Sequence, residues 1–185
     1  MRSHIAMRRN RIGRVVAPIA VLGALSVSIL ASPPPAGADS INGCEIVANP
    51  RVDFHTECVQ ANLSQEDLSS AVDLSYANFD HADLSRDHFT PGTSLTDANL
   101  TQANLSYSLV RNARLPEVIL TNANLQNASF NTDDFSHADL YGANLTGVRF
   151  DDSNLSDANL ADAVMDGTKF CNTTMPDGKV NNAGC

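Results

Sequence analysis

The chain has 185 residues, with 21 acidic side chains against 12 lysines and arginines, and its net charge at pH 7 is −9. A strongly acidic protein does not attract the phosphates of nucleic acid, so we expect no direct binding to DNA or RNA.

Residues 1–38 predict an export signal. Five arginines lie within residues 1–14, and residues 15–30 are apolar and uncharged. Ala36-Gly37-Ala38 offers a small-residue cleavage site. The apolar run, about 16 residues, is shorter than the ~20 of a membrane span, although an uncleaved anchor is the alternative. Cleavage removes five of the twelve basic residues and no acidic ones, which leaves a net charge of −14. Arg8-Arg9 leaves the twin-arginine route open.

Residues 39–60 are expected to form an N-terminal cap on the repetitive region that follows. They carry Cys44 and Cys58, together with four apolar residues that could cover the end of a core, Ile46, Val47, Val52 and Phe54. A cover is needed because the open end of a repeat structure exposes apolar side chains and unpaired backbone.

From Leu63 to Phe170 a large apolar residue recurs every five positions, with two intervals of six, and Ala most often precedes it by two. On an α-helix a step of five turns through about 500°, which would spread these residues around the circumference. On a straight strand an odd step would alternate them between the two faces. The chain must therefore turn once per repeat and coil around an axis, with the apolar residues inside.

Four repeats are expected to make one turn. Phe130, Phe150 and Phe170 stand 20 residues apart, which predicts an all-β, quadrilateral β-helix with about 20 residues per coil and five to six coils. The two six-residue intervals, Leu68 to Leu74 and Phe89 to Leu95, leave the same side and would lie at one corner.

Counting by coils assigns four interior columns. The first column is Leu63, Leu84, Leu105, Leu125, Leu145 and Met165. The second, aromatic column is Leu68, Phe89, Val110, Phe130, Phe150 and Phe170. The third is Leu74, Leu95, Leu115, Phe135, Leu155 and Met175, and the fourth is Phe79, Leu100, Leu120, Leu140, Leu160 and Val180. Three carboxylates also fall at inward positions, where they must bend outward or find partners because burial is costly: Glu66, Asp87 and Asp133.

Residues 171–185 are expected to form a C-terminal cap that carries Cys171 and Cys185. The coils between the two cysteine pairs would span roughly 25 Å at a rise near 4.8 Å per coil. A disulfide needs Cα atoms within about 7 Å, so we expect Cys44–Cys58 and Cys171–Cys185. A zinc site is the rival interpretation, which export and the absence of a Cys-x-x-Cys spacing disfavour.

The repeat units resemble the pentapeptide-repeat family over about residues 61–170. Its pattern is visible in Ala61-Asn62-Leu63-Ser64, Ala98-Asn99-Leu100-Thr101 and Ala158-Asn159-Leu160-Ala161. The resemblance implies that the quadrilateral β-helix is right-handed.

No catalytic constellation is visible, and we expect no enzyme activity, no cofactor and no metal. His81, His88 and His137 fall on three different sides of the coil. Asp133-Asp134 and Asp151-Asp152 lie near one corner and could attract a cation, but they match no calcium-binding loop.

Two surface features are expected on the outside of the coil. Tyr107 and Leu109 could form a small apolar patch. One outward column predicts a ladder of stacked polar side chains: Asn62, Asp83, Asn104 and Asn144.

We expect a secreted or envelope-located, monomeric, non-enzymatic protein that presents a rigid acidic surface to a protein or envelope partner. The alternative comes from the resemblance, because some family members imitate DNA and bind type II topoisomerases such as gyrase. Gyrase is cytosolic, where disulfides rarely persist, so export and the cysteines stand against this alternative. An enzyme on a β-helix would need acids and bases clustered on one face, which the sequence does not show.

Overall fold

The computed structural model describes residues 39–41, 44–47, 50–53, 55–64 and 73–185. The chain divides into two units, Met1–Pro33 and Pro34–Cys185, and every described residue belongs to the second. The expected export signal, together with Phe54, Glu66 and Leu68, lies outside the described residues. Among the described residues there are strands and turns but no helix, and so none that is long and apolar enough to cross a membrane.

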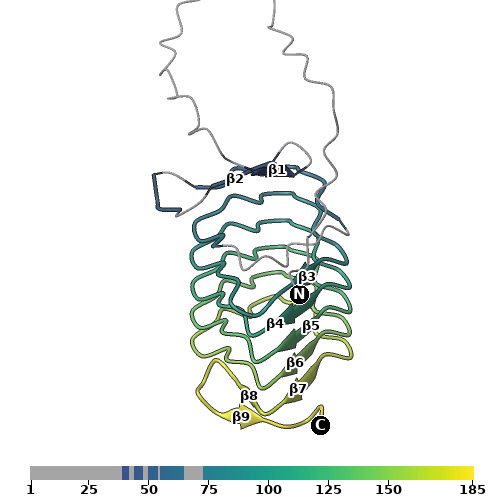
Figure 1. Cartoon of the computed structure of the whole chain (residues 1–185). Coiled ribbons are helices and arrows are strands. Elements are labelled where there is room, and N and C mark those ends of the chain that lie inside the picture. The colour runs from purple at the N-terminus through teal and green to yellow at the C-terminus, as the bar shows by residue number, and fades with distance from the viewer. Residues whose placement is uncertain (1–38, 42–43, 48–49, 54, 65–72) are drawn as a thin grey trace, which may run out of the picture. The chain divides into compact units, whose positions relative to one another are not determined.

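This unit is a coil in which each five-residue segment pairs with the segment one coil later (Figure 1). Asn104 pairs in parallel with Asn124, and Asn124 with Asn144. The hydrogen bonds alternate in direction, since Leu125 N–H donates to Asn144 O at 2.9 Å while Asn144 N–H donates to Ala123 O at 2.9 Å. Backbone groups inside the stack are therefore satisfied without long strands.

Four rows of parallel pairing run along the coil, and one of them forms a five-stranded sheet. Its order is β3-β4-β5-β6-β7, with Phe130 opposite Phe150 and Phe150 opposite Phe170. The strands are β3 (His88–Phe89), β4 (Leu109–Arg111), β5 (Ser129–Asn131), β6 (Arg149–Asp151) and β7 (Lys169–Cys171). The other three rows consist of isolated bridges, so the turns there follow each other too closely for a strand.

The turn between rows places one residue in the left-handed region of backbone space. Asn127 has φ 57°, Asp157 has φ 57° and Gly147 has φ 68°. Asn, Asp and Gly adopt this conformation most easily, which explains why polar turn residues recur with the five-residue period. The side chain that precedes each apolar residue closes the turn as well, because Asn124 Oδ1 accepts the N–H of Gln126 at 3.2 Å.

The six-residue interval across Pro91-Gly92 lies at a corner of the coil. Phe89 pairs with Val110, 21 residues later, whereas Val110 pairs with Phe130, 20 residues later. The extra residue is accommodated at Gly92, whose φ of 95° disfavours any other residue. The other interval, Leu68 to Leu74, begins outside the described residues.

The apolar columns form one continuous core. Phe130 and Phe150 stack with ring centroids 5.3 Å apart, and Phe135 meets Phe130 edge-on at 4.9 Å. Phe170 stacks on Phe150 at 5.8 Å and is 9% exposed. Seven other residues of the first two columns are buried, namely Leu63, Leu84, Leu105, Leu125, Leu145, Phe89 and Val110.

The N-terminal cap begins as an antiparallel hairpin, β1 (Asp39–Ile41) with β2 (Cys44–Ile46). A disulfide joins Cys44 to Cys58, and both are buried. Cys58 stands one coil ahead of Phe79 in the fourth column, and its N–H donates to Asn78 O at 2.8 Å. The coil therefore starts within the expected cap, before residue 61.

Val52 was expected to cover the core, and this was wrong, because its side chain is 71% exposed. The disulfide already fills the first position of the fourth column, and Ile46 packs against the core beside it. The short turn that carries Val52 is thus left outside the packed cap.

The C-terminal cap turns back on itself after Thr174. β8 (Thr173–Thr174) pairs antiparallel with β9 (Val180–Asn181), and a disulfide joins Cys171 to Cys185. Because the chain reverses here, no coil stacks on the last residues of the first and fourth columns. Met165 and Val180 were predicted to be interior, and this was wrong, since they are 43% and 55% exposed.

Candidate interaction surfaces

The outward side of β3–β7 carries one aligned row of side chains. Each residue of the row precedes a member of the aromatic column, and strand pairing places each opposite the next: His88, Leu109, Ser129, Arg149 and Lys169. A second row, two residues further on, places Arg111 opposite Asn131 and Asn131 opposite Asp151. The inward phenylalanines between the rows hold this surface rigid.

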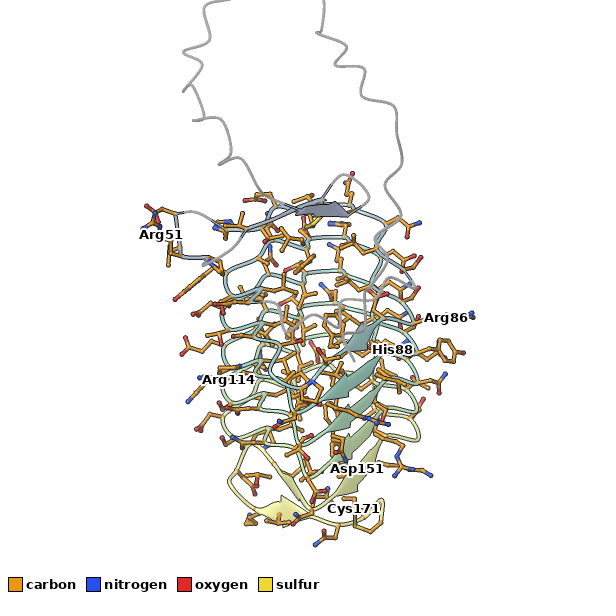
Figure 2. The ribbon with its side chains drawn as sticks, in the orientation of Figure 1. Arg51, Arg86, His88, Arg114, Asp151 and Cys171 are labelled. Atoms are coloured by element: carbon orange, nitrogen blue, oxygen red, sulfur yellow. A yellow bond between two sulfur atoms is a disulfide. The ribbon has the colours of Figure 1, made fainter. Side chains whose placement is uncertain are left out.

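Basic residues gather on this surface although the protein is acidic. Seven lysines and arginines follow residue 38. Four of them lie on β3–β7 or on the adjoining turn, and with His88 we call them the basic face: Arg86, Arg111, Arg149 and Lys169. Figure 2 shows Arg86 and His88 on one side of the view and Arg114 on the other.

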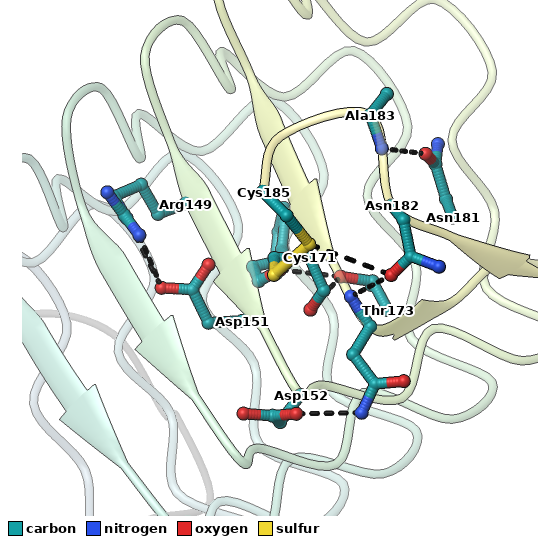
Figure 3. Close-up of a disulfide and its surroundings, with 11 residues drawn as sticks. Arg149, Asp151, Asp152, Cys171, Thr173, Asn181, Asn182, Ala183 and Cys185 are labelled. Carbon is teal, nitrogen blue, oxygen red and sulfur yellow. Dashed lines mark hydrogen bonds and ion pairs between the residues drawn. A yellow bond between two sulfur atoms is a disulfide. The ribbon is translucent and has the colours of Figure 1, made fainter.

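The basic face is only partly neutralised. Asp151, the one acidic residue within β3–β7, accepts from Arg149 at 2.8 Å (Figure 3). Arg111 and Lys169 are exposed, and neither forms an ion pair with any residue that the structure describes. Two unpaired cations therefore point to solvent from the sheet.

Tyr107 lies beside this surface and Leu109 lies on β4, at the positions where the sequence predicts an apolar patch. Tyr107 is 52% exposed and Leu109 is 38% exposed. The Arg86 guanidinium lies 5.8 Å from the centre of the Tyr107 ring, within the range of a cation–π contact. The patch is thus part aromatic and part cationic.

Acidic side chains occupy other parts of the coil. The turns that follow the third column carry four of them in line, interrupted by His137: Asp97, Glu117, Asp157 and Asp177. Asp177 is paired with Lys179, which lowers the pKa of Asp177. These four carboxylates therefore share one corner of the coil, whereas four of the seven basic residues lie on or beside the sheet.

The predicted ladder of polar side chains forms along the first row. Asn104 Nδ2 donates to Asp83 Oδ1 at 3.0 Å, and Asn124 Nδ2 donates to Asn104 Oδ1 at 3.1 Å. Asn144 Nδ2 continues it with a bond to Asn124 Oδ1 at 3.3 Å. These amides are engaged with each other, so the ladder holds coils together.

The aspartates near the second corner do not converge on a common point. Asp133 is buried, Asp151 pairs with Arg149, and Asp152 accepts a bond from Asn172 Nδ2 at 2.7 Å (Figure 3). Within the described residues no three acidic, histidine or cysteine side chains lie close enough to hold a metal ion.

Asp133 finds its partners in the backbone. Oδ1 accepts the N–H of Ala113 at 2.7 Å, and Oδ2 accepts the N–H of Asn131 at 2.8 Å. Burial raises the pKa of Asp133 to about 7, while the two backbone donors act in the opposite direction. Asp87 is buried as well, two coils earlier, at the inward position that precedes Phe89 in the aromatic column.

The three histidines lie apart. His81 Nδ1 contacts Asp80 Oδ1 at 2.8 Å, His88 belongs to the basic face, and His137 is exposed on the acidic corner. A shallow depression lies at the β8–β9 hairpin, lined by Met175, Pro176, Asp177, Lys179, Val180, Asn181 and Asn182. Its charged residues, Asp177 and Lys179, are bonded to each other.

The basic face was missed by reasoning from the sequence. Its signal was present, because four of its members hold fixed places within the repeat next to the aromatic column. The net charge of the chain hides the basic face, because it adds the few basic residues of this side to the many acidic residues elsewhere.

A chain that coils with a five-residue period and pairs in parallel with itself is a β-solenoid. The family described as pentapeptide repeats matches residues 55–86, 93–131 and 138–175 in eight copies. The chain belongs to this family, as the repeat units predicted, and it has the right-handed β-helix of that family. A comparison with curated protein sequences gave no match.

Several solved structures are similar to the chain. A pentapeptide repeat protein from the thylakoid lumen of Arabidopsis thaliana is 27% identical, with a TM-score of 0.44, and the match covers 47% of this chain and 61% of that one. HetL of the cyanobacterium Nostoc, involved in heterocyst differentiation regulation, is 21% identical over 68% and 76%, with a TM-score of 0.33. QnrB1, a plasmid-mediated fluoroquinolone resistance protein, is 16% identical over 64% and 70%, with a TM-score of 0.43.

Proposed function

We propose that this is an exported, non-enzymatic interaction protein that acts as a monomer and offers a partner the flat sides of a rigid coil. The observation that carries the proposal is the pair of disulfides at the two ends of one continuous core. Disulfides persist outside the cytosol, and a core closed at both ends suits a protein that must last there.

The geometry of the coil supports this role. We propose that the four rows of pairing are the four sides of a quadrilateral coil, with about 20 residues per coil and five to six coils. Residues 1–38 then serve as the export signal, which is removed, and residues 39–60 and 171–185 close the ends. Solenoids of this kind offer extended surfaces whose shape is fixed before a partner arrives.

Export is tested by changing the predicted cleavage site. The protein is followed in cells and in the medium or envelope fraction, using an Ala38→Leu variant and a Gly37→Leu control. Small residues are needed at the first and third positions of the site but not at the second. We expect wild type and Gly37→Leu to be exported and shortened, while Ala38→Leu keeps its leader. An unshortened wild-type protein in the cytosol would contradict the proposal.

A second candidate function, DNA mimicry toward gyrase, draws on the line of acidic turns at Asp97, Glu117, Asp157 and Asp177. The basic face and the two disulfides weigh against it. A supercoiling assay with purified gyrase distinguishes the two, because a DNA mimic inhibits at concentrations comparable to the enzyme, and we expect no inhibition.

A further inference from the structure

We propose that the basic face binds an anionic polysaccharide, laid along the coil axis across β3–β7. The inference rests on the proposed role as an exported interaction protein and names the class of its partner. Three features of the face carry it: the spacing of its cations, its flatness, and the aromatic contact at one edge.

The cations are spaced for a polymer of moderate charge density. Adjacent parallel strands lie ~4.8 Å apart, so Arg149 and Lys169 are separated by about one such step along the coil axis. Arg111 lies two strands before Arg149 and also two residues further along its strand, which adds roughly 7 Å across the face. Duplex DNA carries one charge per ~1.7 Å, which is denser than the cations of this face. A chain of acidic sugars carries its charges one or two rings apart, and the cations fit that spacing.

Between the cations the face offers hydrogen-bonding groups. Ser129 and Asn131 lie on β5, between Arg111 on β4 and Arg149 on β6. A hydroxyl and an amide can each donate and accept, as sugar hydroxyls require. Guanidinium groups supply paired donors for carboxylates, and Arg111 is not engaged in an ion pair with any described residue.

At the edge of the basic face, two bulky residues lie at turn positions with a left-handed backbone conformation, which such residues rarely adopt. Arg86 has φ 65° and Tyr107 has φ 61°, whereas the same turn in later coils carries Asn127 and Gly147. Bulky residues in this region cost free energy, and such costs concentrate at functional sites. The exposed Tyr107 ring, with Arg86 over it, gives a sugar ring an apolar surface beside a positive charge.

Other occupants fit the face less well. A polypeptide strand joins a sheet through the edge, whereas this surface is the flat side of β3–β7. A second copy docked face to face would set the unpaired Arg111 and Lys169 of one sheet against the same cations of the other. The polysaccharide is therefore the partner that matches charge, spacing and shape together.

The test uses the full chain without residues 1–38 and a polygalacturonate oligomer, with neutral dextran for comparison. Fluorescence anisotropy of the labelled sugar measures the dissociation constant at low and at physiological ionic strength. We expect polygalacturonate to bind in a salt-sensitive manner and dextran not to bind. The double variant Arg111→Ala/Lys169→Ala should weaken binding roughly tenfold, because it removes two exposed charge contacts.

Two matched variants make the result specific. Arg114→Ala removes an exposed arginine from another side of the coil. It should change the affinity less than about twofold, because salt screens a charge at that distance from the bound sugar. Tyr107→Asn restores the residue type of the later turn and should weaken binding while the melting temperature stays level or rises. Both outcomes distinguish binding at the basic face from nonspecific attraction to any positive charge on the protein.

Four results would overturn the inference. The first two are an affinity for dextran equal to that for polygalacturonate, and equal losses of affinity in Arg114→Ala and the double variant. The other two are binding of poly-glutamate or duplex DNA as tight as that of polygalacturonate, and self-association of the protein that the double variant abolishes. The last result would identify a second copy as the occupant. None of these results bears on export, which the leader variants test separately.

Discussion

At the scale of single residues, Asp133 shows how the coil accepts an exception to its pattern. The same inward position holds Ala113 in the preceding coil and Ser153 and Thr173 in the following ones. The carboxylate is buried, but each of its oxygens accepts a backbone N–H. Asp133 therefore replaces an apolar contact with hydrogen bonds that tie adjacent segments together, as the cost of an unpaired buried carboxylate requires.

This arrangement predicts a pH-dependent stability. Burial raises the pKa of Asp133 from 3.8 to about 7 in the folded protein. The folded state then holds the proton more tightly, so the contribution is largest below pH 4 and is lost as pH rises through about 7. The loss is at most about 4 kcal/mol, a figure that already includes the opposing effect of the two backbone donors.

Asp133→Ser should remove this dependence, because serine stands at the same place in the next coil as Ser153, whose hydroxyl accepts the N–H of Asp133 at 3.3 Å. Urea unfolding at pH 4.5 and 7.5 measures the change in each protein. Between pH 4.5 and pH 7.5 the wild type should lose more stability than the variant. Equal losses in the two proteins would show that the pKa of Asp133 is not raised by folding.

A second prediction concerns the enclosed leucines. Leu125 is fully buried between Leu105 and Leu145. Leu125→Ala should therefore lower the free energy of unfolding by about 2–5 kcal/mol, the usual range for a core truncation. The half-buried neighbour supplies a control, since Gln126→Ala should cost far less. Equal losses in denaturant titrations would contradict the inward assignment.

The turn positions give a third prediction, this time of a gain in stability. Thr132 has φ 62°, and a β-branched residue is strained there, while the same corner carries Asn112, Asp152 and Asn172 in other coils. Thr132→Asn should raise stability by about 1 kcal/mol, because Asn tolerates the left-handed conformation better. Thermal unfolding measures it, with Thr132→Val as a control that should bring no gain. A lower melting temperature for the Asn variant would show that the backbone at Thr132 is not strained.

At the scale of elements, the sequence could predict the coils but not their ends. The five-residue period sets the direction of Leu125 and Phe150 because every coil repeats the same turn. No such period governs the cap that holds Val52, and Met165 keeps the period but has no coil stacked on it, so both were assigned wrongly. Cys58 precedes Leu63 by five residues and so keeps the period, but it was missed as a core residue because the coil was expected to begin at residue 61.

The C-terminal disulfide is expected to stabilise the last coil locally. It joins Cys185 to Cys171 on β7 (Figure 3). Beside it, Gly184 N–H donates to Phe170 O at 2.8 Å, which holds the end of the chain against β7. The chain-entropy model gives roughly 3 kcal/mol for a loop of about 15 residues. In Cys171→Ser/Cys185→Ser, amide hydrogen exchange should rise from about residue 160 onward and stay slow near Leu105 and Leu125. Uniform acceleration would show that the cap acts on the whole coil.

At the scale of the molecule, the protein combines an acidic exterior with one cationic side. The net charge of −14 after residue 38 could be predicted from the sequence, but the separation of charge could not be read from it. Arg111 and Lys169 are distant along the chain, and only the coil brings them to one sheet. The same sheet is the most regular row of the fold, which keeps these charges in fixed positions.

The most direct test of the account is the intact mass of the native protein recovered outside the cytosol. An exported, capped coil should begin at or near Asp39, contain no free thiol, and yield the linked peptides Cys44–Cys58 and Cys171–Cys185 after proteolysis. A protein that begins with Met1 and carries reduced cysteines, or one in which an N-terminal cysteine is linked to a C-terminal one, would contradict it.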